Sequence, residues 1–119
     1  MSILAQTLYD DFVRREGLSD SPRLQVVYVG AINDSLSDLR VEAGYTVDDI
    51  TSLADTIDLD DELKRTLNRG TRFFMQESGE WTKDTDAISE VKWTQELGRA
   101  RSLKWDADPL WDGAHAASS

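Results

Sequence analysis

The chain has 119 residues, a length that fits one domain and can bury a core without help from disulfides or metal ions. It contains no cysteine, which excludes a disulfide framework and a thiolate metal site. Its 23 acidic and 13 basic residues give a formal net charge of −10, which argues against a basic groove for nucleic acid or for an anionic membrane surface.

The N-terminal stretch has no basic run before its apolar residues, so we expect no signal peptide. No apolar run approaches the roughly 20 residues that span a bilayer. Three interpretations of the negative charge remain open: simple solubility, a surface that repels DNA, and a mimic of DNA that occupies the basic cleft of another protein.

Two helices are predicted in the first third of the chain. Leu4, Leu8 and Phe12 recur every four residues and predict a helix over residues 2–16, which Gly17 ends. Ser21 as N-cap and Pro22 at the first helical position announce a second helix, which runs to Gly44. Its apolar residues follow a helical period: Val29, Ile32, Leu36, Leu39 and Ala43.

Residues 45–58 allow two interpretations. Their apolar residues could share one face of a helix, namely Val47, Ile50, Leu53 and Ile57. Threonine and aspartate are dense in the same stretch, however, and both favour turns and caps. We therefore expect a mostly extended arm, which can hold a short strand or a β-hairpin.

A third helix is predicted from about Asp60 to Gly79, with acidic residues at its positive dipole end and Leu59, Leu63, Leu67, Gly70 and Phe74 along one side. A glycine inside a helix costs about 1 kcal/mol relative to alanine, so Gly70 indicates the close approach of another backbone. The basic residues of this helix are expected on its exposed face: Lys64, Arg65, Arg69 and Arg72.

A fourth helix is predicted from about Thr85 to Leu103, capped by Asp84 or Asp86. Its apolar residues spread around the cylinder: Ile88, Val91, Trp93, Leu97, Ala100 and Leu103. Such a helix either lies deep in a bundle or has partners on two sides. The predicted fold is therefore all-α, a four-helix bundle (residues 1–104) with an irregular arm between helices 2 and 3, followed by an extended C-terminal tail (residues 105–119).

The sequence contains no complete motif for calcium binding, nucleophilic catalysis or phosphate binding. The acidic run from Asp58 lacks the glycine and the glutamate of a calcium loop, because Leu63 and Arg69 stand in their places. We interpret it as a helix-capping cluster, with a weak cation site as the alternative. The single histidine, His115, lies in the small-residue tail, and the glycines form no phosphate loop. We expect no catalytic residues, no metal and no cofactor.

The four tryptophans all lie in the last third of the chain. Trp81 is expected to close the end of the bundle, and Trp93 to lie in the core or at a subunit interface. The stretch "KWDADPLWDG" places two tryptophans, a proline and a leucine among acids, a composition typical of docking peptides. Two alternatives remain for it: docking onto another chain or packing back onto its own domain.

The order of these segments resembles that of the small head-to-tail adaptor (connector) proteins of tailed bacteriophages. The resemblance rests on "AINDSLSDLRVEAG", then "DDITSLADTIDLDDELKRTLNRGTRFFMQESGEW", then a final helix and an aromatic tail, over roughly residues 3–112. It implies a structural virion protein that is assembled in the host cytoplasm and forms part of the neck. It also implies partners: the portal, neighbouring copies in a ring expected to be dodecameric, and a downstream tail or stopper protein. The resemblance further implies that DNA would pass through the ring without specific binding, during genome packaging and ejection.

The resemblance also implies roles for particular residues. The tail would dock onto the portal through Trp105, Asp106, Asp108, Pro109, Leu110 and Trp111. Subunits would meet through Trp81, Val91, Trp93 and Leu97. The seven acids of the arm and the next helix start would face the DNA lumen or the next tail protein: Asp48, Asp49, Asp55, Asp58, Asp60, Asp61 and Glu62.

The rival hypothesis is an acidic DNA mimic or another intracellular inhibitory or interaction protein. A mimic needs acids spaced along a surface like phosphates. Here the acids gather between residues 48 and 62, and bases are frequent on the third predicted helix, which favours the adaptor.

Overall fold

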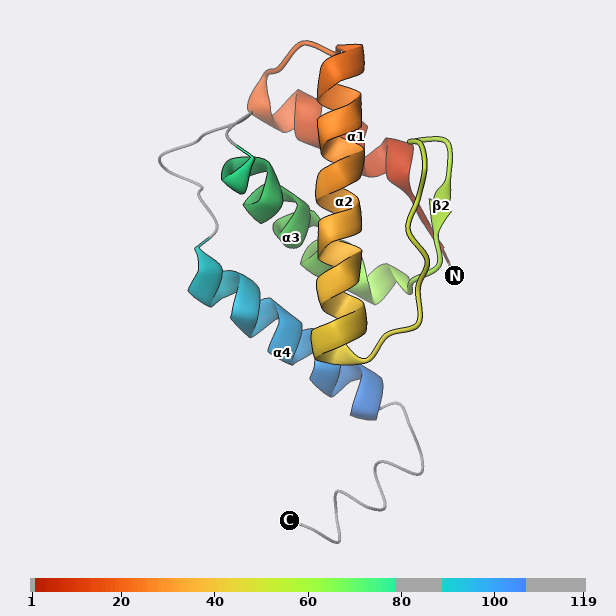
Figure 1. Ribbon diagram of the computed structural model, residues 1–119, viewed down its shortest axis with the longest axis vertical. Helices are drawn as coiled ribbons and strands as arrows, with labels where there is room; N and C mark the ends of the chain where they lie inside the picture. Colours follow the sequence, from red (N-terminus) through yellow and green to blue (C-terminus); the bar gives the residue numbers. More distant parts are fainter. Residues whose placement is uncertain (1, 79–88, 107–119) are drawn as a thin grey trace, which may run out of the picture.

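The computed structural model describes residues 2–78 and 89–106 of the chain. In these residues the fold is all-α, as the sequence predicted, with four helices and one small antiparallel sheet (Figure 1). The elements, in chain order, are β1 (Ile3–Leu4), α1 (Ala5–Glu16), α2 (Pro22–Ala43), β2 (Thr56–Ile57), a 3₁₀ turn η1 (Asp61–Leu63), α3 (Lys64–Glu77) and α4 (Glu90–Asp106).

The first helix begins later than its apolar spacing predicted. Ile3 and Leu4 are extended and form β1, which pairs antiparallel with β2 so that Ile3 lies opposite Ile57. The amide of Ala5 donates to the carbonyl of Asp55 at 3.3 Å, which continues the pairing into the first residue of α1. The helix prediction was wrong for these residues because strand pairing satisfies their backbone, and the sequence does not show the partner.

Both ends of α2 agree with the sequence. The Ser21 hydroxyl accepts a hydrogen bond from the Leu24 amide at 3.1 Å, and Pro22 occupies the first helical position. Gly44 ends the helix with a φ of 79°, a left-handed conformation that glycine adopts without steric cost. The buried face of α2 carries the predicted Ile32, Leu36, Leu39 and Ala43, while Val29 is only half-buried.

The segment after Gly44 is the extended arm that the sequence predicted, and β2 is its short strand. Four of its apolar side chains are buried in the core, and most of the residues between them are exposed, Ala54 included. The buried residues are Val47, Ile50, Leu53 and Ile57. The helical interpretation of this arm was wrong, although the same four residues do form its buried side.

The space beside Gly70 is filled by side chains of neighbouring helices and not by another backbone. A Cβ built on Gly70 would lie 2.7 Å from Cζ3 of Trp93 and 2.7 Å from Oγ of Ser35, far closer than real carbon atoms approach. The indole of Trp93 therefore lies directly against the backbone of α3. We expected another backbone at this point, but the close approach comes from a tryptophan of α4.

Two basic residues of α3 form ion pairs and do not belong to its exposed face. Arg72 pairs with Glu16 of α1, whose side chain is 2 % exposed, and Arg69 pairs with Glu96 of α4 at 2.5 Å. Arg72 and Glu16 are both mostly buried, and removing one partner of a buried pair costs about 3–5 kcal/mol because a charge is then left without compensation. The Arg69 side chain is 36 % exposed, so its pair contributes less. These pairs therefore join α3 to both neighbouring helices, whereas Lys64 and Arg65 are exposed as expected.

The last helix, α4, begins at Glu90, and the hydroxyl of the preceding Ser89 caps it by accepting from the Lys92 amide at 3.1 Å. The predicted caps Asp84 and Asp86 lie outside the described residues. At the other end α4 continues to Asp106, so Trp105 and Asp106 are helical and not the start of an extended tail. Its buried residues lie on one face, whereas Val91 is 67 % exposed, so the apolar residues are not spread evenly.

An aromatic cluster joins α1 to α2. The rings of Tyr9 and Phe12 lie 5.4 Å and 5.2 Å from the ring of Tyr28, centroid to centroid. The Tyr9 hydroxyl donates to Asp20 at 2.5 Å, and burial with this hydrogen bond raises the pKa of Tyr9 to about 12. The buried Tyr28 hydroxyl has no hydrogen-bond partner among the described residues, and burial raises the pKa of Tyr28. The α1–α2 contact therefore depends mainly on ring packing.

The contact between Gly70 and Trp93 predicts opposite effects for two glycine substitutions. Gly70→Ala should lower the free energy of unfolding by about 1–3 kcal/mol, because the added methyl overpacks the core. Gly98→Ala is the matched control, since a Cβ at Gly98 of α4 meets nothing within 4 Å. It should leave stability unchanged or raise it by up to about 1 kcal/mol through helix propensity. Denaturant unfolding of both variants measures the difference; equal destabilisation by the two would contradict this account.

Candidate functional site

The acidic residues between 48 and 62 form an exposed surface. All of them are exposed except Asp55, which is half-buried. No group of three His, Cys, Asp or Glu side chains in the described ranges could hold a metal ion, so nothing in these residues supports the weak cation site considered as an alternative. The single histidine, His115, lies outside the described ranges.

Asn33 of α2 holds the middle of the arm (residues 45–58). Its side-chain amide donates to the carbonyl of Ile50 at 2.9 Å, and its side-chain oxygen accepts from the amide of Ile50 at 2.8 Å. Both backbone groups of Ile50 are thus paired by one side chain, in the manner of a neighbouring strand. The arm is extended yet fixed to the helix because its backbone finds partners there.

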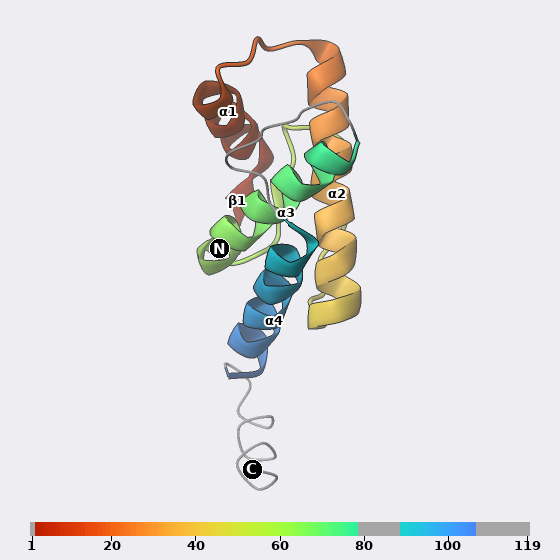
Figure 2. The same ribbon diagram turned by 90° about the vertical axis from the view of Figure 1, so that its left-hand side faces the viewer.

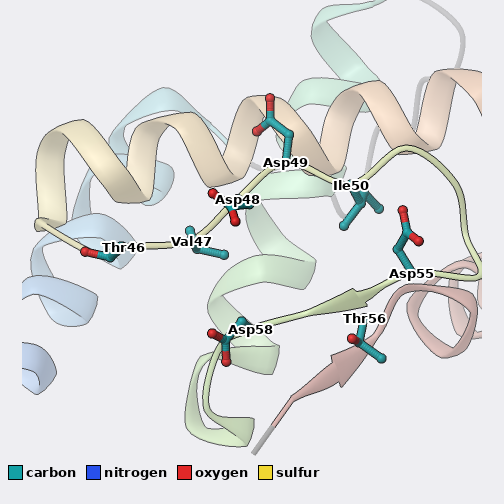
Figure 3. A pocket seen from close by; sticks show the side chains of 8 residues that line it. All are labelled: Thr46, Val47, Asp48, Asp49, Ile50, Asp55, Thr56 and Asp58. Atoms are coloured by element: carbon teal, nitrogen blue, oxygen red, sulfur yellow. The ribbon is translucent and has the colours of Figure 1, made fainter.

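Arg40, seven residues along α2 from Asn33, makes the next attachment. Its guanidinium donates to the carbonyl of Val47 at 2.8 Å and lies 3.0 Å from a carboxylate oxygen of Asp49. Asp49 therefore turns toward α2, as Figure 3 shows, and one of the expected acidic residues is partly neutralised.

Asp55 orders the turn at the tip of the arm. Its carboxylate accepts from the Thr51 amide at 2.8 Å, from the Thr51 hydroxyl at 2.9 Å and from the Ser52 amide at 3.2 Å. These hydrogen bonds, the Thr51 amide first, lower the pKa of Asp55 below its ordinary value of 3.8. Asp55 thus has a structural role, and the other acids of the arm carry most of its accessible charge.

A hollow of about 330 Å³ lies between the two runs of the arm (Figure 3). Asp48 lines it from the outgoing run, and Asp55 and Asp58 line it from the returning run around β2. The negative surface continues onto α2, where burial and the nearby carboxylates of Asp38 and Asp49 raise the pKa of Asp34. The arm and the adjoining part of α2 therefore present one negative surface.

Trp93 and Leu97, expected at a subunit interface, are buried inside a single chain. Trp93 is 3 % exposed, and its indole N–H donates to a carboxylate oxygen of Asp38 at 2.8 Å. Its ring also meets that of Phe74 edge-on, with centroids 6.3 Å apart. These two side chains have little surface left for a neighbouring subunit. Val91 alone of the described interface candidates is exposed.

Further contacts fix α4 against the arm and α3. The Tyr45 hydroxyl donates to the carbonyl of Ala100 at 2.6 Å, and the ammonium of Lys104 lies 5.4 Å from the centre of the Tyr45 ring. The buried Glu96 accepts from Arg69 and, at 3.2 Å, from the hydroxyl of Thr66. The end of α4 therefore has a fixed position relative to the acidic arm.

The proposed docking tail lies largely outside the described residues. Trp105 and Asp106 form the end of α4. The remaining candidates are not described: Asp108, Pro109, Leu110, Trp111 and the interface candidate Trp81. Their roles stay predictions.

The residues that hold the site together were missed in the sequence. Asn33 and Arg40 lie seven residues apart on one side of α2, beside its apolar stripe, and their polar side chains reach the arm. That spacing was a usable signal for a polar attachment site. Asp38 and Glu96 gave no such signal, because their partners come from other helices.

Comparison with known proteins identifies no relative: no family model, no curated protein and no solved structure matches this chain. Within residues 2–78 and 89–106, none of the helices has the length and apolar character needed to cross a bilayer.

Asn33→Ala should release the arm from α2. The amide and carbonyl of the buried Ile50 would lose their partners, which costs about 1–3 kcal/mol. Relative to the native chain, hydrogen exchange at the Ile50 amide should become faster by a larger factor than exchange at the amides of α3. Ser37→Ala, an exposed position on the same helix, serves as the control and should leave exchange in the arm unchanged. Unchanged protection of Ile50 in Asn33→Ala would contradict the attachment.

The turn around Asp55 should loosen only in strong acid. Because its folded pKa lies below 3.8, the stabilisation is complete above the pKa of an unfolded aspartate and is lost as the pH falls through the lower, folded value. The amide resonances of Thr51 and Ser52, followed by NMR, should titrate with a midpoint below 3.8 in the native chain and lose this transition in Asp55→Asn. A midpoint at or above 3.8 would refute the role of Asp55.

Proposed function

We propose that this chain is a structural virion protein, a head-to-tail adaptor of a tailed bacteriophage that forms a ring, binds the portal and extends the DNA channel toward the tail. The observation that carries the proposal is the order and form of the elements. A 22-residue α2 ends at Gly44, an extended acidic arm follows, and two further helices complete the fold. This is the arrangement on which the resemblance rests.

The length of α2 suits a ring wall. At 1.5 Å per residue its 22 residues span about 33 Å, and the other helices pack across it (Figure 1). The domain is tied together by ion pairs and buried aromatic rings, so each subunit can act as a stiff block. Stiff blocks suit a structural part of a particle.

The acidic surface fits a channel for DNA. Phosphates bind proteins chiefly through lysine and arginine, so a surface of carboxylates repels the duplex and lets it slide. The attachments of Asn33 and Arg40 hold the carboxylates of the arm in place. In the proposed particle this surface faces either the lumen or the next tail protein.

The C-terminal stretch would provide the portal contact. Aromatic residues at the centre of an interface carry most of its binding energy, and Trp111 with Leu110 and Pro109 would supply such a centre. The stretch follows α4, whose C-terminal half is anchored to Tyr45 through Ala100 and Lys104. A docked tail would thus be connected directly to the folded domain.

Deleting residues 107–119 tests the proposal. The deletion begins after the last residue of α4, so the helical domain should keep its circular dichroism and unfolding midpoint. Capture by purified portal particles should be abolished, because the aromatic anchor is lost. Deleting only residues 114–119 removes the small-residue end and is the matched control, with capture expected to stay normal.

Electron microscopy of the native chain with portal particles should show a ring stacked beneath the portal. Undiminished capture of the chain that lacks residues 107–119 would refute the docking tail. Absence of any native chain on the portal would refute the adaptor function itself. Salt-sensitive displacement of DNA from a basic partner by the isolated chain would instead support the DNA mimic.

A further inference from the structure

The outer face of α4 has no partner within the described part of the chain. Its middle is a ridge of small or neutral exposed residues: Val91, Gln95, Gly98 and Ser102. A Cβ at Gly98 would meet no atom within 4 Å, so this ridge is open to close approach by another surface.

Basic residues flank this ridge on both sides. At 100° per residue, Lys92 and Arg99 fall along one edge and Arg101 along the other. Lys92 and Arg101 form no ion pair with any described residue, and Arg99 lies 3.7 Å from the buried Glu96. Lys92 and Arg99 therefore make one edge of this face positive, in a chain whose net charge is −10. Arg101, on the other edge, lines a groove together with Asp38, Glu42 and Glu90.

The hollow of the arm does not contact α4, although the arm begins beside it, where the Tyr45 hydroxyl donates to the carbonyl of Ala100. In Figure 1 α4 runs from the left to beneath the lower end of α2, and β2 lies at the right, beyond α2. In Figure 2, seen from the left, α4 is in front and the arm is behind. The exposed acids Asp48 and Asp58 of the hollow have no partner among the described residues.

We propose that the outer face of α4 binds the acidic arm of a second copy of this chain. The two surfaces have opposite charge, and the hollow between Asp48 and Asp58 has room for the end of a lysine or arginine side chain. The small residues of the ridge let the arm approach the helix closely.

A contact between two different surfaces of the same molecule is head-to-tail. Repeated from copy to copy, it closes into a ring or continues as an open filament. The inference rests on the proposed function, because it names the surfaces through which adaptor subunits would meet. It takes Asp48 and Asp58 into this contact and leaves Asp60, Asp61 and Glu62, which do not line the hollow, for the lumen or the next tail protein. A nucleic acid fits the same basic face less well, because its phosphates would meet a chain of net charge −10.

Charge reversal on each surface tests the contact. The variant Lys92→Glu with Arg101→Glu should not bind native arms, and Asp48→Lys with Asp58→Lys should not bind native α4. In sedimentation velocity at low salt and high protein concentration, each variant should associate at least about tenfold more weakly than the native chain. The association of the native chain should also weaken with salt, since the Debye length falls from about 30 Å at 0.01 M to about 8 Å at 0.15 M.

Mixing the two variants gives the decisive result. Each reversed surface then meets its complement on the other variant, so an equimolar mixture should associate again. Arg15→Glu with Arg65→Glu is the matched control, because it also reverses two exposed bases, on α1 and α3, and should behave as the native chain does. A mixture that stays monomeric, a control that loses association, or a native chain that is monomeric at low salt would each overturn the contact.

The outcome separates this contact from the adaptor function. If both reversed variants still stack as complete rings on portal particles, the contact is refuted while the adaptor function stands. If the variants behave as expected in solution but the native chain never binds a portal, the contact stands and the adaptor function fails.

Discussion

The indole of Trp93 against the backbone of Gly70 is the contact on which the arrangement of the helices depends. The ring lies between α4 and α3, and its N–H is held by Asp38 of α2, so one side chain joins three helices. Only glycine leaves space for it at that point of α3. The buried pairs of Glu96 with Arg69 and of Glu16 with Arg72 then fix the remaining helix faces.

That helical frame positions an arm that has almost no regular structure of its own. Asn33 and Arg40 replace the backbone partners that a sheet would offer, and β2 borrows its strand partner from the N-terminus. The carboxylates of the hollow are consequently held in place, apart from the exposed bases of α4.

The sequence was informative wherever the signal is local. Ser21, Pro22 and Gly44 marked the ends of α2, and dense threonine and aspartate marked the arm as extended. It failed where the partner lies far along the chain: Ile3 pairs with Ile57, and Arg72, expected on the surface, pairs with Glu16. Trp93 and Leu97 show the same limit, because an apolar residue on a helix suits a core as well as an interface.

The sequence by itself determined the all-α class, the helix ends and the concentration of acids in the arm, because caps, glycines and charges act over a few residues. The tertiary structure alone decided which polar side chains hold the arm and which face of α4 is left uncovered. Those outcomes depend on hydrogen bonds and close contacts between segments that meet only when the chain folds.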